Sequence, residues 1–389
     1  MLPLVGRVRN YAWGSPTAIP EILGTDPTGE PQAEYWLGAH PLAPATVDGE
    51  PLDQLLAEHP EWVGKRCRKL FGDRFPVLTK LLAADKPLSL QAHPNAEQAK
   101  EGFAREEAAG VPLDAPERTY KDDWPKPELL IALNEFDGLC GFRQPRETVE
   151  LFGRLGLADD LGSVIKPLSQ RKGSAALAQV FLDILSLDDT ELVARTVQAA
   201  RGHLGDPHAL GDFARTAVEL DAHFPHDPSI LAALLLNRVH LEPGEAMYLP
   251  PRTLHSYLHG VAVEVMASSD NVLRGGLTRK HIDVDELIRV VEFVPSEAGP
   301  APRTPDHGFV RYITPTLEFT AWRGDLNHHR LSVPATKSCR VALATDGEAE
   351  LRGPSGSIDL DVGQAALIPY GEEVTAVGSA TLFVTSPGV

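Results

Sequence analysis

The polar side chains best suited to chemistry are concentrated between residues 254 and 280, in a segment that otherwise has the apolar pattern of a strand. This segment brings together an imidazole, a phenol, two carboxylates and three cations, namely His255, Tyr257, Glu264, Asp270, Arg274, Arg279 and Lys280. Imidazole and carboxylate groups bind metal ions, and neighbouring Arg and Lys side chains attract anions. The segment therefore predicts part of a metal site beside a pocket for an anionic substrate.

Two other segments have the same character. In the apolar run 87–93, Ser89, Gln91 and His93 alternate with apolar residues, so they share one face of a predicted strand. Glu128 follows Lys126-Pro127 and begins a further apolar run. We therefore expect one metal site to be assembled from three segments that are far apart in the sequence.

A zinc site without cysteine uses imidazole nitrogen and carboxylate or other oxygen, and a catalytic site keeps a position open for water or substrate. Two nitrogens and two oxygens would come from Gln91, His93, Glu128 and His255. The spacing alone also allows both histidines to be hydrogen-bonded residues of the core or surface, with Gln91 an ordinary polar strand residue. Four other histidines are predicted to be surface residues: His223, His226, His328 and His329.

The cations fit a phosphate pocket, because Arg offers a forked pair of donors and Lys a compact charge. Arg274, Arg279 and Lys280 could equally lie on a solvated loop as counterions for an acidic surface. Lys126 could orient a substrate or be an ordinary loop residue. Glu264 lies within the apolar run 261–266, where a carboxylate needs a partner, so we expect it to be functional or ion-paired.

Composition limits the class of protein. The 389 residues suggest two or three domains, and 43% hydrophobic residues can form a substantial core. The formal net charge of −18 argues against general nucleic-acid or anionic-membrane binding, although a local cluster of cations can still bind a small anion. No run of 18 uninterrupted apolar residues predicts a membrane span, and the amino terminus lacks the pattern of a signal peptide. With only three cysteines and no C-x-x-C pair, the sequence fits the reducing cytoplasm.

Apolar periodicity indicates which elements position these residues. Strands are predicted at 75–82, 87–93 and 128–133, with a Pro-rich loop over 111–127. Asn95 and Gln98 resemble a capping box, so a helix is predicted over 96–109, closed by Gly110. Between 145 and 236, apolar residues recur every three or four positions, which predicts an inserted helical domain covering one side of the pocket.

Strands return at 239–241 and 246–249, and the Pro-rich stretch 295–305 predicts a linker. Residues 241–250 and 360–369 share a turn–strand–Pro pattern, which favours two cupin-like jelly-roll β-barrels. The second copy has no histidine where the first has His255, so we interpret it as structural. The predicted fold is mainly β: residues 1–144 and 237–294 form a split catalytic barrel, 145–236 an α-helical domain, and 306–389 a second barrel.

Several of these motifs, in this order, resemble the type I mannose-6-phosphate isomerase (phosphomannose isomerase) family, whose members are zinc enzymes of the cupin superfamily. The resemblance spans the chain and rests on Asn10-Tyr11-Ala12-Trp13-Gly14-Ser15, Glu34-Tyr35-Trp36-Leu37-Gly38-Ala39-His40-Pro41, Pro76-Val77-Leu78-Thr79-Lys80-Leu81-Leu82, Leu88-Ser89-Leu90-Gln91-Ala92-His93-Pro94, Lys126-Pro127-Glu128, Leu139-Cys140-Gly141-Phe142-Arg143 and the block 241–278. It implies one zinc per chain, held by Gln91, His93, Glu128 and His255, and interconversion of mannose 6-phosphate and fructose 6-phosphate through a cis-enediol. It also implies substrate contacts near the phosphate or sugar from Ser89, Arg274 and Lys280, and a pocket lined by Trp13, His40, Lys126, Tyr257, Glu264 and Asp270.

The implied reaction needs a base that moves a proton between C2 and C1 and groups that stabilise the enediolate. Lys126 and Arg274 could stabilise the developing negative charge, and we expect Arg274 and Glu264 to be important for catalysis. The residue types leave the base open among four candidates: His40, Tyr257, Glu264 and Asp270.

The sequence departs from the family pattern in two places. Pro125 stands where the family commonly has His before Lys-Pro-Glu, with Trp124 in place of a small polar residue, and Pro250-Pro251-Arg252-Thr253 replaces a small, Gly-containing stretch. Two alternatives to an isomerase are a metal cupin oxygenase, which would usually have two or more histidines around an open iron site, and a sugar-binding or regulatory protein that has lost turnover. Pro125 favours the second alternative. The retained cations, carboxylates and ligand types favour a cytoplasmic phosphosugar isomerase, expected to be a monomer.

Overall fold

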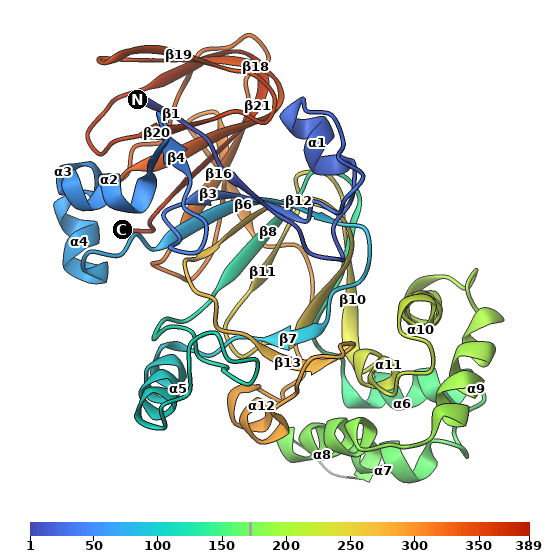
Figure 1. Ribbon diagram of the computed structural model, residues 1–389. Helices are drawn as coiled ribbons and strands as arrows, with labels where there is room; N and C mark the ends of the chain where they lie inside the picture. The colour runs from blue at the N-terminus through green and yellow to red at the C-terminus, as the bar shows by residue number, and fades with distance from the viewer. Residues whose placement is uncertain (171–172) are drawn as a thin grey trace.

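Strand β12 (His255–Ala267) runs through the larger of the two main antiparallel sheets and carries His255, Tyr257 and Glu264 of the polar segment singled out above. A computed structural model describes residues 1–170 and 173–389 (Figure 1). The first residues of β12 pair with β7 (Leu90–Ala92) and β9 (Phe136–Phe142), and its last residues pair with β6 (Val77–Ala84) and β8 (Glu128–Ala132). One strand therefore brings the three chemistry-bearing segments together.

The remaining strands of this sheet extend it on both sides. They are β2 (Arg7–Arg9), β3 (Glu34–Gly38), β10 (Leu236–Leu241), β11 (Ala246–Leu249) and β13 (Leu273–Gly276). Along the main path the order is β10-β9-β12-β6-β3-β2, with β11 paired to β8 and β13 paired to β7. A separate hairpin joins β4 (Thr46–Val47) and β5 (Glu50–Pro51).

The second sheet contains the carboxyl-terminal strands: β14 (Arg303–Asp306), β15 (Phe309–Tyr312), β16 (Thr320–Asp325), β17 (Leu331–Ser332), β18 (Arg340–Gly353), β19 (Gly356–Leu360), β20 (Ala365–Ile368) and β21 (Thr375–Ser386). It also takes in β1 (Leu2–Leu4), which pairs with β20. A strand from the segment 1–144 therefore extends the sheet of the carboxyl-terminal strands. Leu4 is buried in the core that the two sheets share.

The helices fall into two groups. Those around the sheets are α1 (Ala18–Leu23), α2 (Leu52–Glu58), α3 (Pro60–Val63), α4 (Lys65–Phe71), α5 (Ala96–Ala108) and α12 (Val284–Val290). The predicted helical segment contains α6 (Pro145–Arg154), α7 (Gly162–Gln170), α8 (Ser174–Leu185), α9 (Thr190–Arg201), α10 (His208–His223) and α11 (Ser229–Ala233). Figure 1 shows α6–α11 as a separate cluster on the side of the larger sheet away from the carboxyl-terminal strands.

The two-residue period of β12 divides its side chains between two environments. Val263 and Val265 pack into an apolar core that also contains Val341 and Phe383 of the second sheet. Glu264 points to the opposite face, since successive strand residues alternate. The sheets thus bury one face against each other and leave the other face free to form a site. The α6–α11 helices share a further core with β7, β9 and β13, which fixes their position beside this face.

The structure confirms several expected elements and shortens others. The capping box at the start of α5 is present, because the Asn95 side chain accepts from the Gln98 N–H and the Gln98 side chain from the Asn95 N–H. The predicted strand 87–93 is reduced to β7. Pro87 and Pro94 at its ends have no N–H to give to a sheet. The predicted linker 295–305 is also shorter, since β14 begins at Arg303.

The two segments with a shared sequence pattern have the same local geometry. Gly244 and Gly363 have φ angles of 83° and 81°. In the first turn the Glu245 N–H donates to the Glu242 carbonyl at 2.9 Å, and in the second the Gln364 N–H donates to the Asp361 carbonyl at 3.0 Å. The shared sequence pattern therefore corresponds to equivalent turns, which lie directly before β11 and before β20.

The three cysteines, Cys67, Cys140 and Cys339, are buried free thiols. Within the described part of the chain, no helix has both the length and the apolar character that crossing a membrane requires.

Candidate metal centre and active-site cavity

The pairing of β13, β7 and β12 puts Arg274, Gln91 and His255 side by side. Gln91 lies opposite both Arg274 and His255 in the strand register. Opposed residues of antiparallel strands project from the same face, with their Cβ atoms about 4.5–5.5 Å apart. The register therefore places two expected zinc ligands and the expected phosphate cation in one row across three strands.

A second row crosses β3, β6, β12 and β8. Lys80 lies opposite Trp36 on one side and Glu264 on the other, and Glu128 lies opposite Met266. Because Glu264 and Met266 are two residues apart, Glu264 and Glu128 project from the same face. Glu128 contacts both His93 and His255 and so connects this row, which crosses β12 near its end, with the first row at the beginning of β12.

His93, Glu128 and His255 form a buried cluster at the ends of β7, β8 and β12. The His93 Nε2 lies 3.3 Å from Oε1 of Glu128, and the His255 Nε2 lies 3.4 Å from its Oε2. Two ligands that each lie about 2.0–2.1 Å from a tetrahedral zinc are about 3.4 Å apart. The separations therefore match those of groups around a single metal ion.

The hydrogen bonds of the two imidazoles leave one nitrogen of each ring free to bind a metal ion. The His93 Nδ1 lies 2.6 Å from the Asn271 carbonyl oxygen, and the His255 Nδ1 lies 3.0 Å from the Thr253 carbonyl oxygen. A carbonyl only accepts, so each Nδ1 carries the proton and each Nε2 presents a lone pair. Both Nε2 atoms are buried without a hydrogen-bond partner, which is costly unless a metal ion takes that place. Burial also lowers the pKa of His93 to about 4, which keeps its imidazole neutral.

The Glu128 carboxylate is held ionised by its surroundings. Burial alone would raise its pKa, but its interactions with His93, Lys126 and His255 lower it well below the usual range. The Lys126 ammonium lies 3.2 Å from Oε1 of Glu128. An anionic carboxylate between two imidazoles that each present an Nε2 atom is a ligand set suited to zinc, and these residues therefore fit the ion that the sequence predicts.

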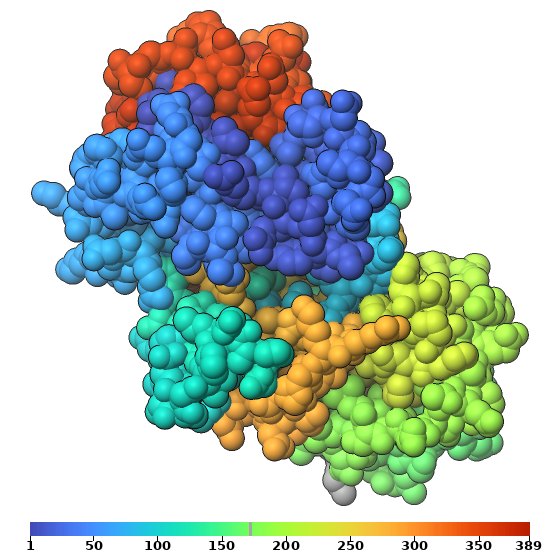
Figure 2. All heavy atoms as spheres, viewed as in Figure 1, coloured from blue at the N-terminus to red at the C-terminus, as the bar shows by residue number. Residues whose placement is uncertain are grey.

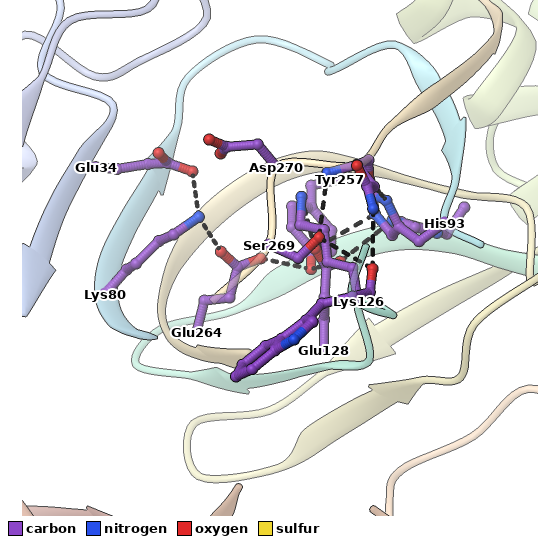
Figure 3. Close-up of polar contacts among 12 residues, drawn as sticks. Glu34, Lys80, His93, Lys126, Glu128, Tyr257, Glu264, Ser269 and Asp270 are labelled. Carbon is purple, nitrogen blue, oxygen red and sulfur yellow. Dashed lines mark hydrogen bonds and ion pairs between the residues drawn. The ribbon is translucent and has the colours of Figure 1, made fainter. Parts of the chain in front are cut away.

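A buried ion-pair network lies beside this cluster (Figure 3). Lys80 is placed between two carboxylates, 2.9 Å from Oε2 of Glu264 and 3.1 Å from Oε1 of Glu34. All three side chains are less than a tenth exposed. Although burial alone would lower the pKa of Lys80, the two carboxylates raise it, so the lysine stays charged. Burial raises the pKa of Glu264 despite Lys80, which brings this carboxyl group closer to the range of a general acid or base.

Tyr257 connects this network to the metal cluster. Its hydroxyl lies 2.9 Å from Oε1 of Glu264 and 3.3 Å from Oε2 of Glu128. A phenol has one proton and donates to one oxygen at a time, and Glu264 is the nearer. Burial and the two carboxylates raise the pKa of Tyr257 well above its ordinary value, so the phenol remains protonated. Tyr257 therefore links the two carboxylates, with Glu264 as the nearer acceptor.

His40 and Asp270 form a second polar pair in the site. The Leu42 N–H donates to Nδ1 of His40 at 3.3 Å, so in neutral His40 the proton resides on Nε2. That nitrogen lies 3.3 Å from Oδ2 of Asp270. Burial would raise the pKa of Asp270, but the hydrogen bond and charge of His40 lower it. Asp270 is thus an oriented, ionised carboxylate.

These residues surround one cavity of about 1280 Å³. With two exceptions, every residue expected to bind metal or substrate or to act in catalysis lines it: Trp13, His40, Ser89, Gln91, Lys126, Glu128, Tyr257, Glu264, Asp270, Arg274, Arg279 and Lys280. The exceptions, His93 and His255, lie behind Glu128. Figure 2 shows a hollow between the amino-terminal part of the chain (blue) and the segments drawn in teal and orange.

The loop before Glu128 is fixed by residues 269–271. The Asp122 carboxylate accepts from the Ser269 hydroxyl at 2.8 Å and from the Asp270 N–H at 2.9 Å. Asn271, whose carbonyl holds His93, also donates to the Trp124 carbonyl at 2.9 Å. The Trp124 ring packs under Arg74, with the guanidinium carbon 4.1 Å from the ring centroid. Pro125 lies outside the cavity lining, so Lys126 is the first residue of this loop after Asp122 to reach the site.

Sequence reasoning missed three residues of the site: Lys80, Glu34 and Trp36, whose indole N–H donates to Glu34 at 2.7 Å. Their segments supported the family resemblance, but their side chains were not singled out. A usable signal was present, because Lys80 interrupts the apolar run 75–82 and a charge buried in a strand needs a partner.

Comparison with known proteins gives consistent matches along the chain. Residues 1–145 match the family model described as phosphomannose isomerase type I, catalytic domain. Mannose-6-phosphate isomerase of Salmonella typhimurium is 37% identical to this chain over 392 residues, which cover 98% of each protein. The Homo sapiens protein of the same name is 29% identical over 422 residues, which cover 100% of this chain and 96% of the human protein. The solved apo form from Salmonella typhimurium has a TM-score of 0.89 at 33% identity and covers 100% of this chain and 99% of that one. A structure of mannose 6-phosphate isomerase described as holo and zinc-bound has a TM-score of 0.88 at 33% identity over the same shares.

Proposed function

This chain belongs to the type I mannose-6-phosphate isomerase (phosphomannose isomerase) family, and from this premise we propose that it interconverts mannose 6-phosphate and fructose 6-phosphate with one zinc ion per chain. The observation that carries the proposal is the buried His93–Glu128–His255 cluster. Its two Nε2 atoms lack partners and its carboxylate is linked through Tyr257 to Glu264. Relatives whose zinc-bound structures are solved support the choice of metal.

We propose Gln91, His93, Glu128 and His255 as the zinc ligands, with Gln91 supported by its position opposite His255. A bound zinc would supply Lewis-acid polarisation of substrate oxygens without a change of redox state. The buried ligands are compatible with one exchangeable position on the side of the cavity.

The protein's own groups can carry the proton transfer. Glu264 lines the cavity, and burial raises its pKa, so it is suited to remove the C2 proton and return it to C1 through a cis-enediol. Lys126 and Arg274 are cations placed to stabilise the negative charge of the enediolate. Asp270, oriented by His40, can accept a proton from a substrate hydroxyl. Tyr257 keeps Glu264 in place.

The remaining expected residues are assigned to binding. Ser89 and Lys280 would hold the phosphate, since both residues line the cavity and Lys280 forms no ion pair with a carboxylate among the described residues. Trp13 would pack against the sugar. We also propose that each of the two main sheets is a cupin-like jelly-roll barrel, which the equivalent turns before β11 and β20 support. The protein would act as a monomer of three domains: a catalytic domain split between residues 1–144 and 237–294, a helical domain of residues 145–236, and a carboxyl-terminal domain of residues 306–389.

The first test is a coupled isomerase assay on mannose 6-phosphate, before and after chelation, with zinc added back. We expect activity to disappear with the chelator and to return with zinc. A preparation with one zinc per chain that still shows no turnover of mannose 6-phosphate would overturn the proposed function.

A further inference from the structure

The helical insertion forms part of the cavity wall. His223, the last residue of α10, and Phe224 line the same cavity as Arg279 and Lys280. Figure 2 shows the orange surface around residues 275–285 in contact with the yellow surface at the end of the helical insertion. His223 was expected to be an ordinary surface residue, and its side chain is indeed exposed, but it is exposed to the cavity.

A close backbone approach fixes this wall. Gly276, the last residue of β13, has a φ angle of 138°, and a Cβ atom there would lie 2.6 Å from the Ser229 side chain. Ser229 begins α11, and its N–H donates to the Asp227 carboxylate at 2.8 Å. The Asp227 N–H in turn donates to the Phe224 carbonyl at 3.1 Å. The turn after His223 is therefore held against the segment that leads to Arg279 and Lys280.

A second set of contacts fixes α10 on the sheet. Glu219 accepts from Arg238 of β10 at 2.8 Å and lies 3.1 Å from Nδ1 of His259 on β12. Glu219 and His223 are four residues apart, so they share one side of the helix. Anchoring Glu219 to the sheet thus orients the side of α10 that carries His223.

The cavity wall made by residues 223 and 274–280 contains cations that are not paired with carboxylates in the described part of the chain. Among the residues that the structure describes, Arg274, Arg279 and Lys280 form no ion pair with a carboxylate. The pKa of Lys280 is lowered by burial and by the neighbouring charge of Arg274. Because the protein has a net charge of −18, uncompensated cations in one wall favour an anionic ligand there.

The size of the cavity makes this wall important for specificity. At about 1280 Å³ it is larger than most ligand pockets, which measure roughly 300–1,000 Å³. A hexose phosphate is too small to be held by shape alone in such a space, so its phosphate has to be located by charge and hydrogen bonds.

We propose that His223 of the helical insertion is a further phosphate-binding residue, which donates a hydrogen bond to the substrate phosphate held by Arg279 and Lys280. This inference rests on the proposed function. It gives the inserted domain a direct part in recognising phosphorylated sugars.

The test compares steady-state kinetics of the wild-type protein with those of His223→Ala on mannose 6-phosphate, together with inhibition by inorganic phosphate. One lost hydrogen bond to a charged group in a solvent-accessible wall should raise KM and the phosphate inhibition constant by about 3- to 10-fold. We expect kcat to change by less than about twofold, because the residue contacts the phosphate and not the reacting carbons. His223→Lys should restore most of the affinity.

His226→Ala is the matched control. His226 is an exposed histidine on the same turn, its Nδ1 lies 4.0 Å from Asp221, and it does not line the cavity. Unchanged KM and phosphate inhibition in His223→Ala, or equal changes in His226→Ala, would overturn the inference while leaving the isomerase intact. If the wild-type protein turned over no mannose 6-phosphate, the proposed function itself would fail, and calorimetric titration of inorganic phosphate into both proteins would then decide the role of His223.

Discussion

Replacing Lys80 with Met should destabilise the protein strongly, because it removes the cation between two buried carboxylates. Lys80 lies 2.9 Å from Glu264 and 3.1 Å from Glu34, and all three side chains are less than a tenth exposed. Removing one partner of a buried ion pair leaves an uncompensated charge and typically costs about 3–5 kcal/mol. Methionine replaces the apolar stem of the lysine and lacks only its terminal ammonium, so little of this cost would come from lost packing.

The cost should depend on pH in a defined direction. Without Lys80, the folded-state pKa of Glu264, already raised by burial, would rise further above its value in the unfolded chain. A carboxyl group with a raised folded-state pKa destabilises the fold once the pH exceeds its unfolded value, and a tenfold change in its proton affinity corresponds to about 1.4 kcal/mol. The free-energy difference between wild type and variant should therefore be larger at pH 8 than at pH 5.5, where the buried carboxyl can take up a proton.

The assay is urea unfolding of both proteins in the presence of a chelator, which keeps metal binding out of the comparison. Lys100→Met serves as the control, because Lys100 is an exposed residue of α5. The reasoning would be refuted if Lys80→Met lost no more stability than Lys100→Met, or if its loss were the same at the two pH values. A Lys80→Met, Glu264→Gln double variant should recover part of the stability, since it removes one of the uncompensated charges.

Other parts of the structure lead to three further predictions. His255→Ala should abolish tight zinc binding, measured as metal content after gel filtration; retention of one zinc per chain would exclude His255 as a ligand. Tyr257→Phe should weaken zinc binding by about 10-fold or more, because Glu128 and Glu264 lose a shared hydrogen-bond donor. The zinc affinity can be measured by competition with a chromogenic chelator, and an unchanged affinity would show that this contact does not support the metal site. Burial would raise the pKa of Asp137, but Arg238 and His259 lower it below the usual value. The ionised Asp137 therefore stabilises the fold at any pH above its pKa in the unfolded chain, and this stabilisation is lost as the pH falls through its pKa in the folded protein. The difference in urea midpoint between wild type and Asp137→Asn should therefore shrink as the pH drops below about 4, and a constant difference would contradict this assignment.

Local sequence was sufficient for features that depend on neighbouring residues. The start of α5 was predictable because a capping box is made by two residues three positions apart, Asn95 and Gln98. The alternation along β12 marked Glu264 as a carboxylate in an apolar strand that needed a partner. The turns before β11 and β20 were recognisable because their glycines and flanking residues repeat a pattern.

The family resemblance extended this reasoning to the site. It named residues that the structure gathers around one cavity and the histidines behind it. The roles of the individual residues in binding and proton transfer stay predictions, which the variants above address.

Only the tertiary structure decided which groups meet. The partners of Glu264 are Lys80, 184 positions earlier in the sequence, and Tyr257, and neither pairing follows from spacing along the chain. Strand register sets such contacts, because a shift of one residue would turn Lys80 away from the cavity and into the apolar core. The wall that contains His223 was equally inaccessible to sequence reasoning, since it depends on how α10 and α11 pack against the end of β13. Residue types and local periodicity thus determined the available chemistry, and long-range packing determined how those groups were combined.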